Sequence, residues 1–282
     1  MVVAAPVVIG MGSAPNLRAQ SDSANRASFE VISIKSAEAT KGRSIGYDLL
    51  AGGRFHASGL PLSMLIGLAY DVPFQSARLT GIPDWAGGVV YTIDAEAEKG
   101  AIPPTLGRKA LFATVRPMLQ SMLADRFKLV IRRETKESPV YVLLQGKSAP
   151  KLKLADIQEK DCYDPASKAD CHNLHGGIGR GMHATAVDLD DIVLFAANWA
   201  DRPILNRTGL TGLYSIDTEG WTPMLPRPPK TDGSPDPEAE SFNDPLRPSL
   251  FTVFSQLGLK LEPQKAPIDM YTVVSVERPS EN

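Results

Sequence analysis

The apolar and polar positions of this chain follow two different periods. Residues 29–35, with the sequence FEVISIK, alternate in the way that is typical of a half-buried strand. Leu62, Leu65, Ile66 and Ala69 recur instead at helical spacing and predict a first helix of about ten residues. Strand-like and helix-like segments then take turns along the chain, so the pattern predicts interleaved strands and helices.

The pattern also repeats itself. Residues 54–69 read RFHASGLPLSMLIGLA and residues 181–196 read GMHATAVDLDDIVLFA, so that a His-Ala-Ser/Thr stretch leads into an amphipathic run in both. Further matches follow in the same order, YTIDAE at 91–96 with YSIDTE at 214–219, and FKL at 127–129 with LKL at 259–261. Three ordered matches indicate a duplicated structural unit.

Each half reads strand, helix, strand, helix, strand, strand. The strands are expected at 54–58, 91–97, 128–132 and 140–144 in the first half, and at 183–185, 213–217, 259–261 and 270–276 in the second. The connections are short and several strands should pair as hairpins. This favours an α+β fold of two pseudo-repeated halves with mixed, largely antiparallel sheets over a doubly wound parallel sheet.

The helix ends carry their own signals. Pro117 interrupts the second helical pattern, and is either a first-turn proline or a kink in a longer helix. Asp188 is a suitable N-cap for the helix that follows it, with Asp190 and Asp191 as helix N-terminal charges rather than a calcium loop. Gly258 should end a helix that begins near Ser249.

Two segments break the symmetry of the halves. Residues 147–180 join them and carry both cysteines and a glycine cluster at 176–181, which is interpreted as a flexible linker. Residues 221–248 are rich in proline and polar side chains and lack apolar periodicity, so we expect a long, mobile surface loop. The expected organisation is thus a leader at 1–20, a first repeat at 21–146, the linker, and a second repeat at 181–282.

Composition adds limits on partners and location. The chain has 282 residues, a net charge of -2 and a pI near 6.1, so no basic excess indicates nucleic acid or an anionic membrane surface as a partner. Its first residues are apolar and then small and polar, which resembles a secretory signal cut near Ala19 or Gln20; the alternative is a disordered apolar tail. No membrane span is expected in the mature chain.

Cys162 and Cys171 are the two cysteines of the chain. Their proximity, together with the leader, predicts a disulfide and a periplasmic or extracellular location. Zinc is the alternative, because His172 and His175 complete a C-x8-C-H-x2-H pattern, but this is not the spacing of a usual zinc finger. We therefore predict no metal site.

Three further residues are candidates for contact with a ligand or partner. His56 and His183 occupy equivalent positions in the repeats, and would form a metal or acid–base pair if they met where the halves join. The simpler interpretation is that each bonds locally on its own strand, with neighbouring carboxylates on a solvated sheet face. Trp221 lies in the proline-rich segment and is expected to be exposed, where it would anchor a partner.

Longer motifs resemble a known family. The segments LSMLIGLAY at 62–70, MLQSMLADRFKL at 118–129, TGLTGLY at 208–214 and ERPSEN at 277–282, together with FEVISIK, resemble the soil-associated proteins, an uncharacterised family of exported bacterial proteins. Some members resemble the extracellular part of larger proteins with a membrane-embedded zinc peptidase, but this chain has no His-Glu-x-x-His motif. A weaker similarity of residues 189–216 to small modules of secretins and TonB-dependent receptors implies contact with other proteins. The resemblance implies no catalytic residues.

The sequence thus favours an exported, non-enzymatic module that binds an unknown protein or small-molecule ligand, without a cofactor. One alternative is a cell-envelope hydrolase that uses His56 or His183 with a carboxylate from the other half. Another is an extracellular structural subunit that assembles with copies of itself.

Overall fold

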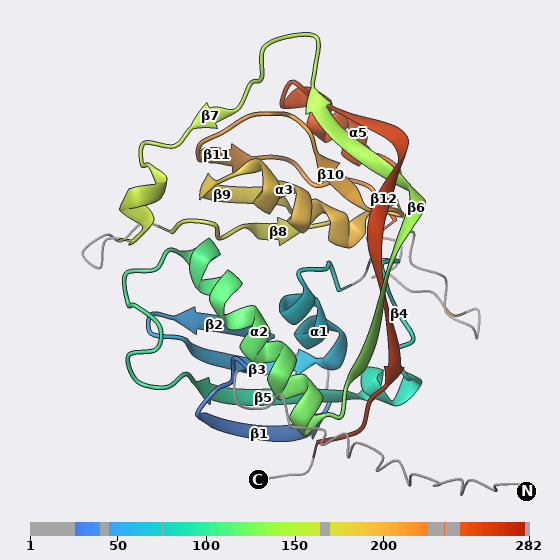
Figure 1. Cartoon of the computed structure of the whole chain (residues 1–282). Helices are drawn as coiled ribbons and strands as arrows, with labels where there is room; N and C mark the ends of the chain where they lie inside the picture. Colours follow the sequence, from blue (N-terminus) through green and yellow to red (C-terminus); the bar gives the residue numbers. More distant parts are fainter. Residues whose placement is uncertain are drawn as a thin grey trace, which may run out of the picture.

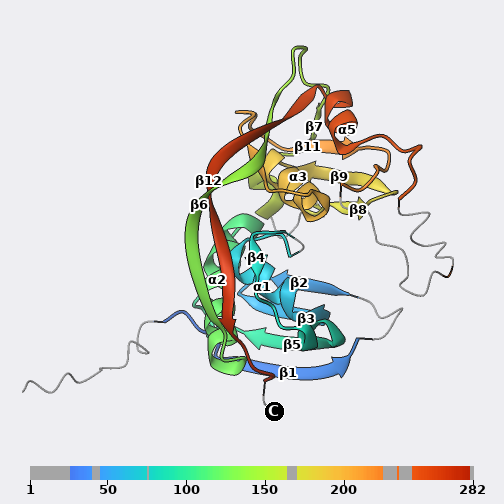
Figure 2. The same cartoon turned by 90° about the vertical axis from the view of Figure 1, so that its right-hand side faces the viewer.

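The computed structural model describes residues 26–39, 45–74, 76–163, 170–224, 234 and 243–279. They form two lobes joined along one side by a pair of long strands (Figures 1 and 2). The sheets are mixed and largely antiparallel, so the predicted α+β class is confirmed. The predicted leader at 1–20 and most of the middle of the proline-rich segment lie outside the described residues.

The first lobe is a four-stranded antiparallel sheet covered on one face by two helices. Its strand order is β1 (Val31–Glu38), β5 (Val89–Glu96), β3 (Arg54–Pro61) and β2 (Gly46–Leu50), and its helices are α1 (Leu62–Tyr70) and α2 (Arg108–Arg126). Alternate strand residues such as Phe55, Ala57 and Ile93 are fully buried in the lobe's core. His56 and Asp94 therefore lie on the opposite, outer face of the sheet.

The second lobe has a sheet of similar design. Its order is β7 (Lys153–Leu154), β11 (Tyr214–Asp217), β9 (Gly181–Val187) and β8 (His175–Gly177), with helices α3 (Leu189–Ala196) and α5 (Leu250–Gln256). The glycine cluster forms the β8–β9 hairpin rather than a flexible linker. Gly181 has a φ of +87°, and a Cβ there would lie 1.9 Å from the carbonyl oxygen of Thr218, so only glycine fits.

Corresponding strands occupy corresponding places in the two sheets. The order β1-β5-β3-β2 in the first lobe matches β7-β11-β9-β8 in the second when β3 is equated with β9 and β5 with β11. His56 lies opposite Asp94 in the first sheet, and His183 lies opposite Asp217 in the second. This is the order that a duplication requires; the duplication itself stays a prediction.

A ribbon of two long strands, β6 (Val130–Gln145) and β12 (Leu259–Ser275), joins the lobes. Each was expected as two short strands, and in the first half Ser138 and Pro139 were expected in the connection between them. This prediction is wrong. Two short strands, β10 (Ile204–Asn206) and β4 (Leu79–Thr80), flank only the ends of the ribbon. In its middle each strand has one unpaired edge, and Pro139 and Pro267 sit there, where a missing N–H costs no ladder hydrogen bond.

The ends of the ribbon belong to different cores. Tyr271 and Val273 of β12 are buried with the first lobe, whereas Leu259 and Leu261 of the same strand are buried with the second. The last strand of the predicted second half thus completes the core of the first lobe.

The helix ends agree with their local signals. Pro117 lies inside the longer helix α2, and the Asp188 side chain accepts the backbone N–H groups of Asp190 and Asp191 at the start of α3. Ser249 caps α5, and Gly258 follows this helix with a φ of +74°. Short 3-10 helices complete the described elements at η2 (Asp84–Gly88), η3 (Glu159–Tyr163) and η4 (Ala197–Trp199). Among the described helices, none combines the length and apolar character that crossing a membrane requires.

Trp221 is not the exposed anchor that the sequence suggested. Its side chain is 0% exposed in the core of the second lobe, and its ring meets Trp199 edge-on with centroids 5.7 Å apart. The neighbouring Thr222 bonds to the backbone of Asp244, Arg247 and Pro248, so the two ends of the proline-rich segment are fastened together. The expectation that Trp221 is exposed was wrong, because it was based on the polar residues that follow Trp221 in the sequence, whereas its burial depends on residues far along the chain.

Replacing Trp221 with alanine should therefore destabilise the protein. We expect the free energy of unfolding to fall by about 3–5 kcal/mol, since a large aromatic side chain leaves a filled core. Leu246→Ala, at a 92% exposed position of the same segment, is the matched control and should change it by less than about 0.5 kcal/mol. Urea denaturation of both variants checks this, and equal midpoints would contradict the burial of Trp221.

Candidate functional site

A cleft of about 580 Å³ lies between the two lobes. Its walls come from α1, the segment after it and α2 in the first lobe, and from α3, η4 and β10 on the second-lobe side. The volume is in the range of small-molecule sites. The apolar lining includes Met64, Leu68, Phe74, Phe112, Val193, Leu194, Ile204 and Leu205.

One wall carries cations around an aromatic ring. Arg108, Phe112 and Arg116 recur every four residues on one face of α2, and the guanidinium groups lie 5.3 and 5.9 Å from the centroid of the Phe112 ring. Tyr47 meets the same ring edge-on at 6.1 Å. Arg116 forms an ion pair with Asp71, whereas Arg108 has no carboxylate partner among the residues that the structure describes.

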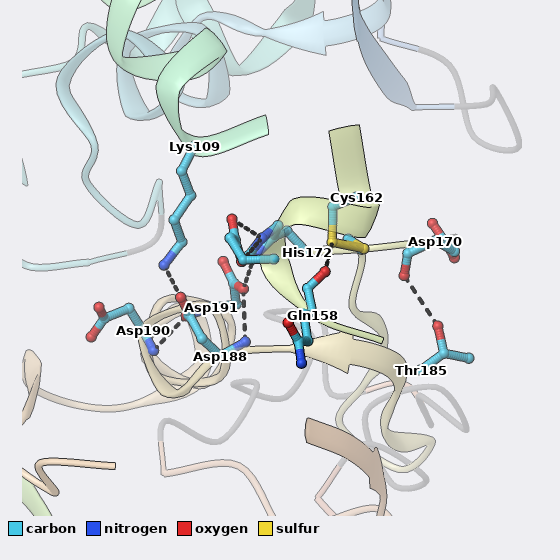
Figure 3. A network of polar contacts seen from close by, with 11 residues as sticks. Lys109, Gln158, Cys162, Asp170, His172, Thr185, Asp188, Asp190 and Asp191 are labelled. Carbon is cyan, nitrogen blue, oxygen red and sulfur yellow. Dashed lines mark hydrogen bonds and ion pairs between the residues drawn. A yellow bond between two sulfur atoms is a disulfide. The ribbon is translucent and has the colours of Figure 1, made fainter. Parts of the chain in front are cut away.

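The opposite wall carries Asp190 and Asp191, and Asp188 lies shortly before them in the chain; all three acids already have partners. Asp188 caps α3 and forms an ion pair with Lys109 of α2, which links the two lobes (Figure 3). Asp190 accepts a hydrogen bond from Asn206 at 2.7 Å. Asp191 accepts the backbone N–H of Asp188 at 3.1 Å and also contacts His172. Burial lowers the pKa of Lys109, but the hydrogen bond to Asp188 and the three nearby acids outweigh it and raise this pKa.

His172 lies at the centre of this network. Its side chain is 2% exposed, with Nδ1 2.6 Å from Asp191 and Nε2 3.1 Å from both carboxylate oxygens of Glu159 (Figure 3). Burial lowers the pKa of His172, but the hydrogen bond and charge of Asp191 and those of Glu159 prevail and raise the pKa above its ordinary value of 6.5. The two carboxylates on either side thus favour the protonated, cationic form of the imidazole.

The predicted disulfide between Cys162 and Cys171 is confirmed. Cys171 directly precedes His172, and Cys162 belongs to η3, the short helix that carries Glu159. The bridge therefore holds Glu159 next to the imidazole. It also removes both thiolates that the zinc alternative needs.

Oxygen and nitrogen atoms of His172, Asp188 and Asp191 lie within 4.8 Å of one another, which is close enough to hold a metal ion. Each group already has a partner, however. Asp188 binds the Lys109 ammonium and two backbone N–H groups, and Asp191 binds His172. The arrangement is satisfied as an ion-pair network that orients the start of α3.

The two candidate histidines do not meet, and neither lines the cleft. The Nδ1 atom of His183 lies 2.6 Å from Asp217, and its Nε2 atom lies 2.6 Å from the carbonyl oxygen of Arg180. Both contacts raise the pKa of His183, and the Arg180 carbonyl has the larger effect. His56 lies 2.7 Å from Asp94 through Nδ1, in a second hollow of about 500 Å³ on the outer sheet face. Each histidine thus bonds locally, within its own lobe.

The cleft-lining cations were missed by sequence reasoning. The spacing of Arg108, Phe112 and Arg116 was available as a helical pattern, but nothing local shows that this face of α2 meets the second lobe. Sequence reasoning also missed the ion pairs of Lys109 and Glu159. The partner of Lys109 is Asp188, far along the chain, and the partner of Glu159 is His172, which the disulfide brings close to it.

The network around His172 predicts a specific pH dependence. A pKa that is raised in the folded state contributes stability below the unfolded value near 6.5, and this contribution is lost as the pH rises through the folded pKa. His172→Gln should lower the free energy of unfolding by about 2 kcal/mol at pH 6 and by less at pH 9.

His175→Gln is the matched control, because His175 is exposed and 3.7 Å from Asp170. Its effect should be small at both pH values in the same urea titrations. A deficit of the His172 variant that does not change with pH would contradict a protonated imidazole.

Comparison with known proteins places the chain in a family. Residues 63–276 match the model of a family described as "Protein of unknown function (DUF3738)". Comparisons with curated proteins and with solved structures give no significant match. Because the matched residues make up more than half of the sequence, the chain belongs to this family of proteins of unknown function, DUF3738.

Proposed function

We propose that this chain is a non-enzymatic binding protein that takes a small organic ligand into the cleft between its lobes. One observation carries the proposal: apolar side chains of both lobes face a single hollow of about 580 Å³. Ligand sites are typically concave and mostly apolar, with a few polar groups that fix orientation.

The two lobes contribute to this hollow in a complementary way. Leu68 and Phe112 come from the helices of the first lobe, and Val193 and Leu194 come from α3 of the second. A ligand in the cleft contacts both walls at once. Its binding therefore adds contacts between lobes that are otherwise joined by the ribbon and by the Lys109–Asp188 pair.

An extracytoplasmic location is part of the proposal. The disulfide between Cys162 and Cys171 supports it, because such bonds persist in oxidising compartments. The apolar residues at 1–20 also support it, since they have the character of a secretory leader.

A hydrolase remains the second candidate, and the pair of His56 and Asp94 favours it. A carboxylate 2.7 Å from Nδ1 orients an imidazole so that Nε2 can act as a base. The hollow beside this pair is lined by polar or charged side chains and by Leu50 and Ala95, from β2, β3 and β5, without a serine, threonine or cysteine among the described lining residues. A base there would have to activate water for hydrolysis. The cleft between the lobes, in contrast, is explained by ligand binding alone, which requires no catalytic group.

A neutral apolar dye tests the cleft as a binding site. N-phenylnaphthylamine should bind to the wild-type protein and increase in fluorescence, and Leu194→Trp should weaken its binding about tenfold by filling the wall of the cleft. Phe251→Trp is the matched control, since Leu194 is 40% and Phe251 38% exposed, and Phe251 does not line the cleft. Dye that binds equally to both variants, or not at all to the wild type, would refute the proposal.

The double variant His56→Ala/His183→Ala separates the two candidate functions. It should bind the dye as tightly as the wild type, because neither histidine lines the cleft. If instead the purified protein turns over a substrate and the variant loses at least about a hundredfold in rate, the hydrolase replaces the binding protein.

A further inference from the structure

Building on the cleft as the binding site of the proposed function, we propose that its ligand is an amphipathic anion. The anionic group binds the guanidinium of Arg108, and the apolar body lies between α1 and α2 on one side and α3 on the other. This assigns a chemical class to the ligand, which the shape of the cleft alone does not.

The charges of the cleft indicate the sign of the ligand. Among the described residues, Asp188, Asp190 and Asp191 each have a polar partner, and Asp71 is paired with Arg116. The guanidinium of Arg108 lies over the Phe112 ring and forms no hydrogen bond or ion pair with any residue that the structure describes. Arg108 is thus a charged group of the lining that has neither a hydrogen-bond nor an ion-pair partner among the described residues. Its charge is positive, and it is half-buried at the wall of the cleft.

Two further donors support this sign. Arg78, also in the lining, donates from Nε to the backbone carbonyl of Asp269 at 3.0 Å rather than to a carboxylate. The Nε of Arg116 is buried and has no hydrogen-bond acceptor in the part of the chain that the structure describes. Guanidinium groups present a planar set of donors that matches a carboxylate, a sulfonate or a phosphate.

The acids of the other wall fix where the anion lies. Asp190 and Asp191 belong to α3, so an anion near that helix would meet like charges. The α2 wall, with Arg108 and Phe112, is the place that combines an unpaired cation with an apolar surface. A single anionic group is therefore expected, because a polyanion would need further unpaired cations.

The remaining surface of the cleft suits an apolar chain or ring. Met64 and Leu68 of α1 lie on the same side as Phe112, and Leu194 and Leu205 face them from the second-lobe side. Burying the methylene groups of a ligand against such side chains favours binding, because it removes apolar surface from water. An aliphatic carboxylate combines this apolar body with the one anionic group that Arg108 can bind.

Three probes with the same ten-carbon chain test the proposal by calorimetric titration of the full chain: decanoate, decanol and decyltrimethylammonium. We expect decanoate to bind about tenfold more tightly than decanol, and the cationic probe to bind most weakly. Arg108→Gln should reduce the affinity for decanoate about tenfold and leave that for decanol unchanged. Arg132→Gln is the control, since Arg132 is an exposed arginine of the ribbon that pairs with Glu134.

The outcomes distinguish this inference from the proposed function. If the wild type binds the three probes with equal affinity and still binds the neutral dye in the cleft, the ligand is not selected as an anion. The proposed function as a binding protein would then stand without this inference. A preference for decanoate that survives in Arg108→Gln would overturn the assignment of the anionic group. The probe series in the wild type tests the sign of the ligand even if the variant does not fold.

Discussion

The antiparallel pairing of β6 with β12 is the constraint on which the arrangement of the molecule depends. It runs from Val130 opposite Ser275 in the first lobe to Leu259 opposite Gln145 in the second, with a register shift between Val273 and Ser275. One ladder thus sets the position of both lobes. Each end adds its side chains to a different core, and β4 and β10 fasten each lobe to the ribbon. The cleft follows from this geometry, because α1 and α2 of the first lobe face α3 of the second beside the ribbon (Figure 2).

In the polar network at one end of the cleft, most charged side chains are paired with a side chain of opposite charge. The disulfide holds η3 beside the segment that begins at Cys171, and Glu159 and Asp191 then enclose His172. The cap of α3 uses Asp188, which also receives Lys109 from the other lobe. Asp188 and Asp191 are thus paired with cations, whereas Arg108 has no carboxylate partner among the described residues, which is why we propose it as the group that meets the ligand. The structural network and the proposed selectivity of the cleft are two results of the same pairing.

Local signals in the sequence predicted local structure well. The N-cap at Asp188 and the end of α5 at Gly258 depend on a few neighbouring residues, and the disulfide followed from a lone pair of cysteines. Features decided by distant contacts were missed. Pro139 was interpreted as a break because an unpaired strand edge, where proline is harmless, cannot be recognised without the partner strand. Trp221 and Arg108 show the same limit: burial of the one and the cleft position of the other depend on packing between segments far apart in the chain.

The mixed membership of β12 also bears on how the chain folds. Tyr271 and Val273 fill the core of the first lobe, although most of that core comes from residues before Leu129. During synthesis the first lobe therefore lacks these two side chains until the whole second lobe has emerged. Pairing of such distant strands is slow, because the entropy cost of closing a long loop comes before the contacts that compensate for it can form. A chain of this design completes the core of its first lobe only after its last strand has been synthesised.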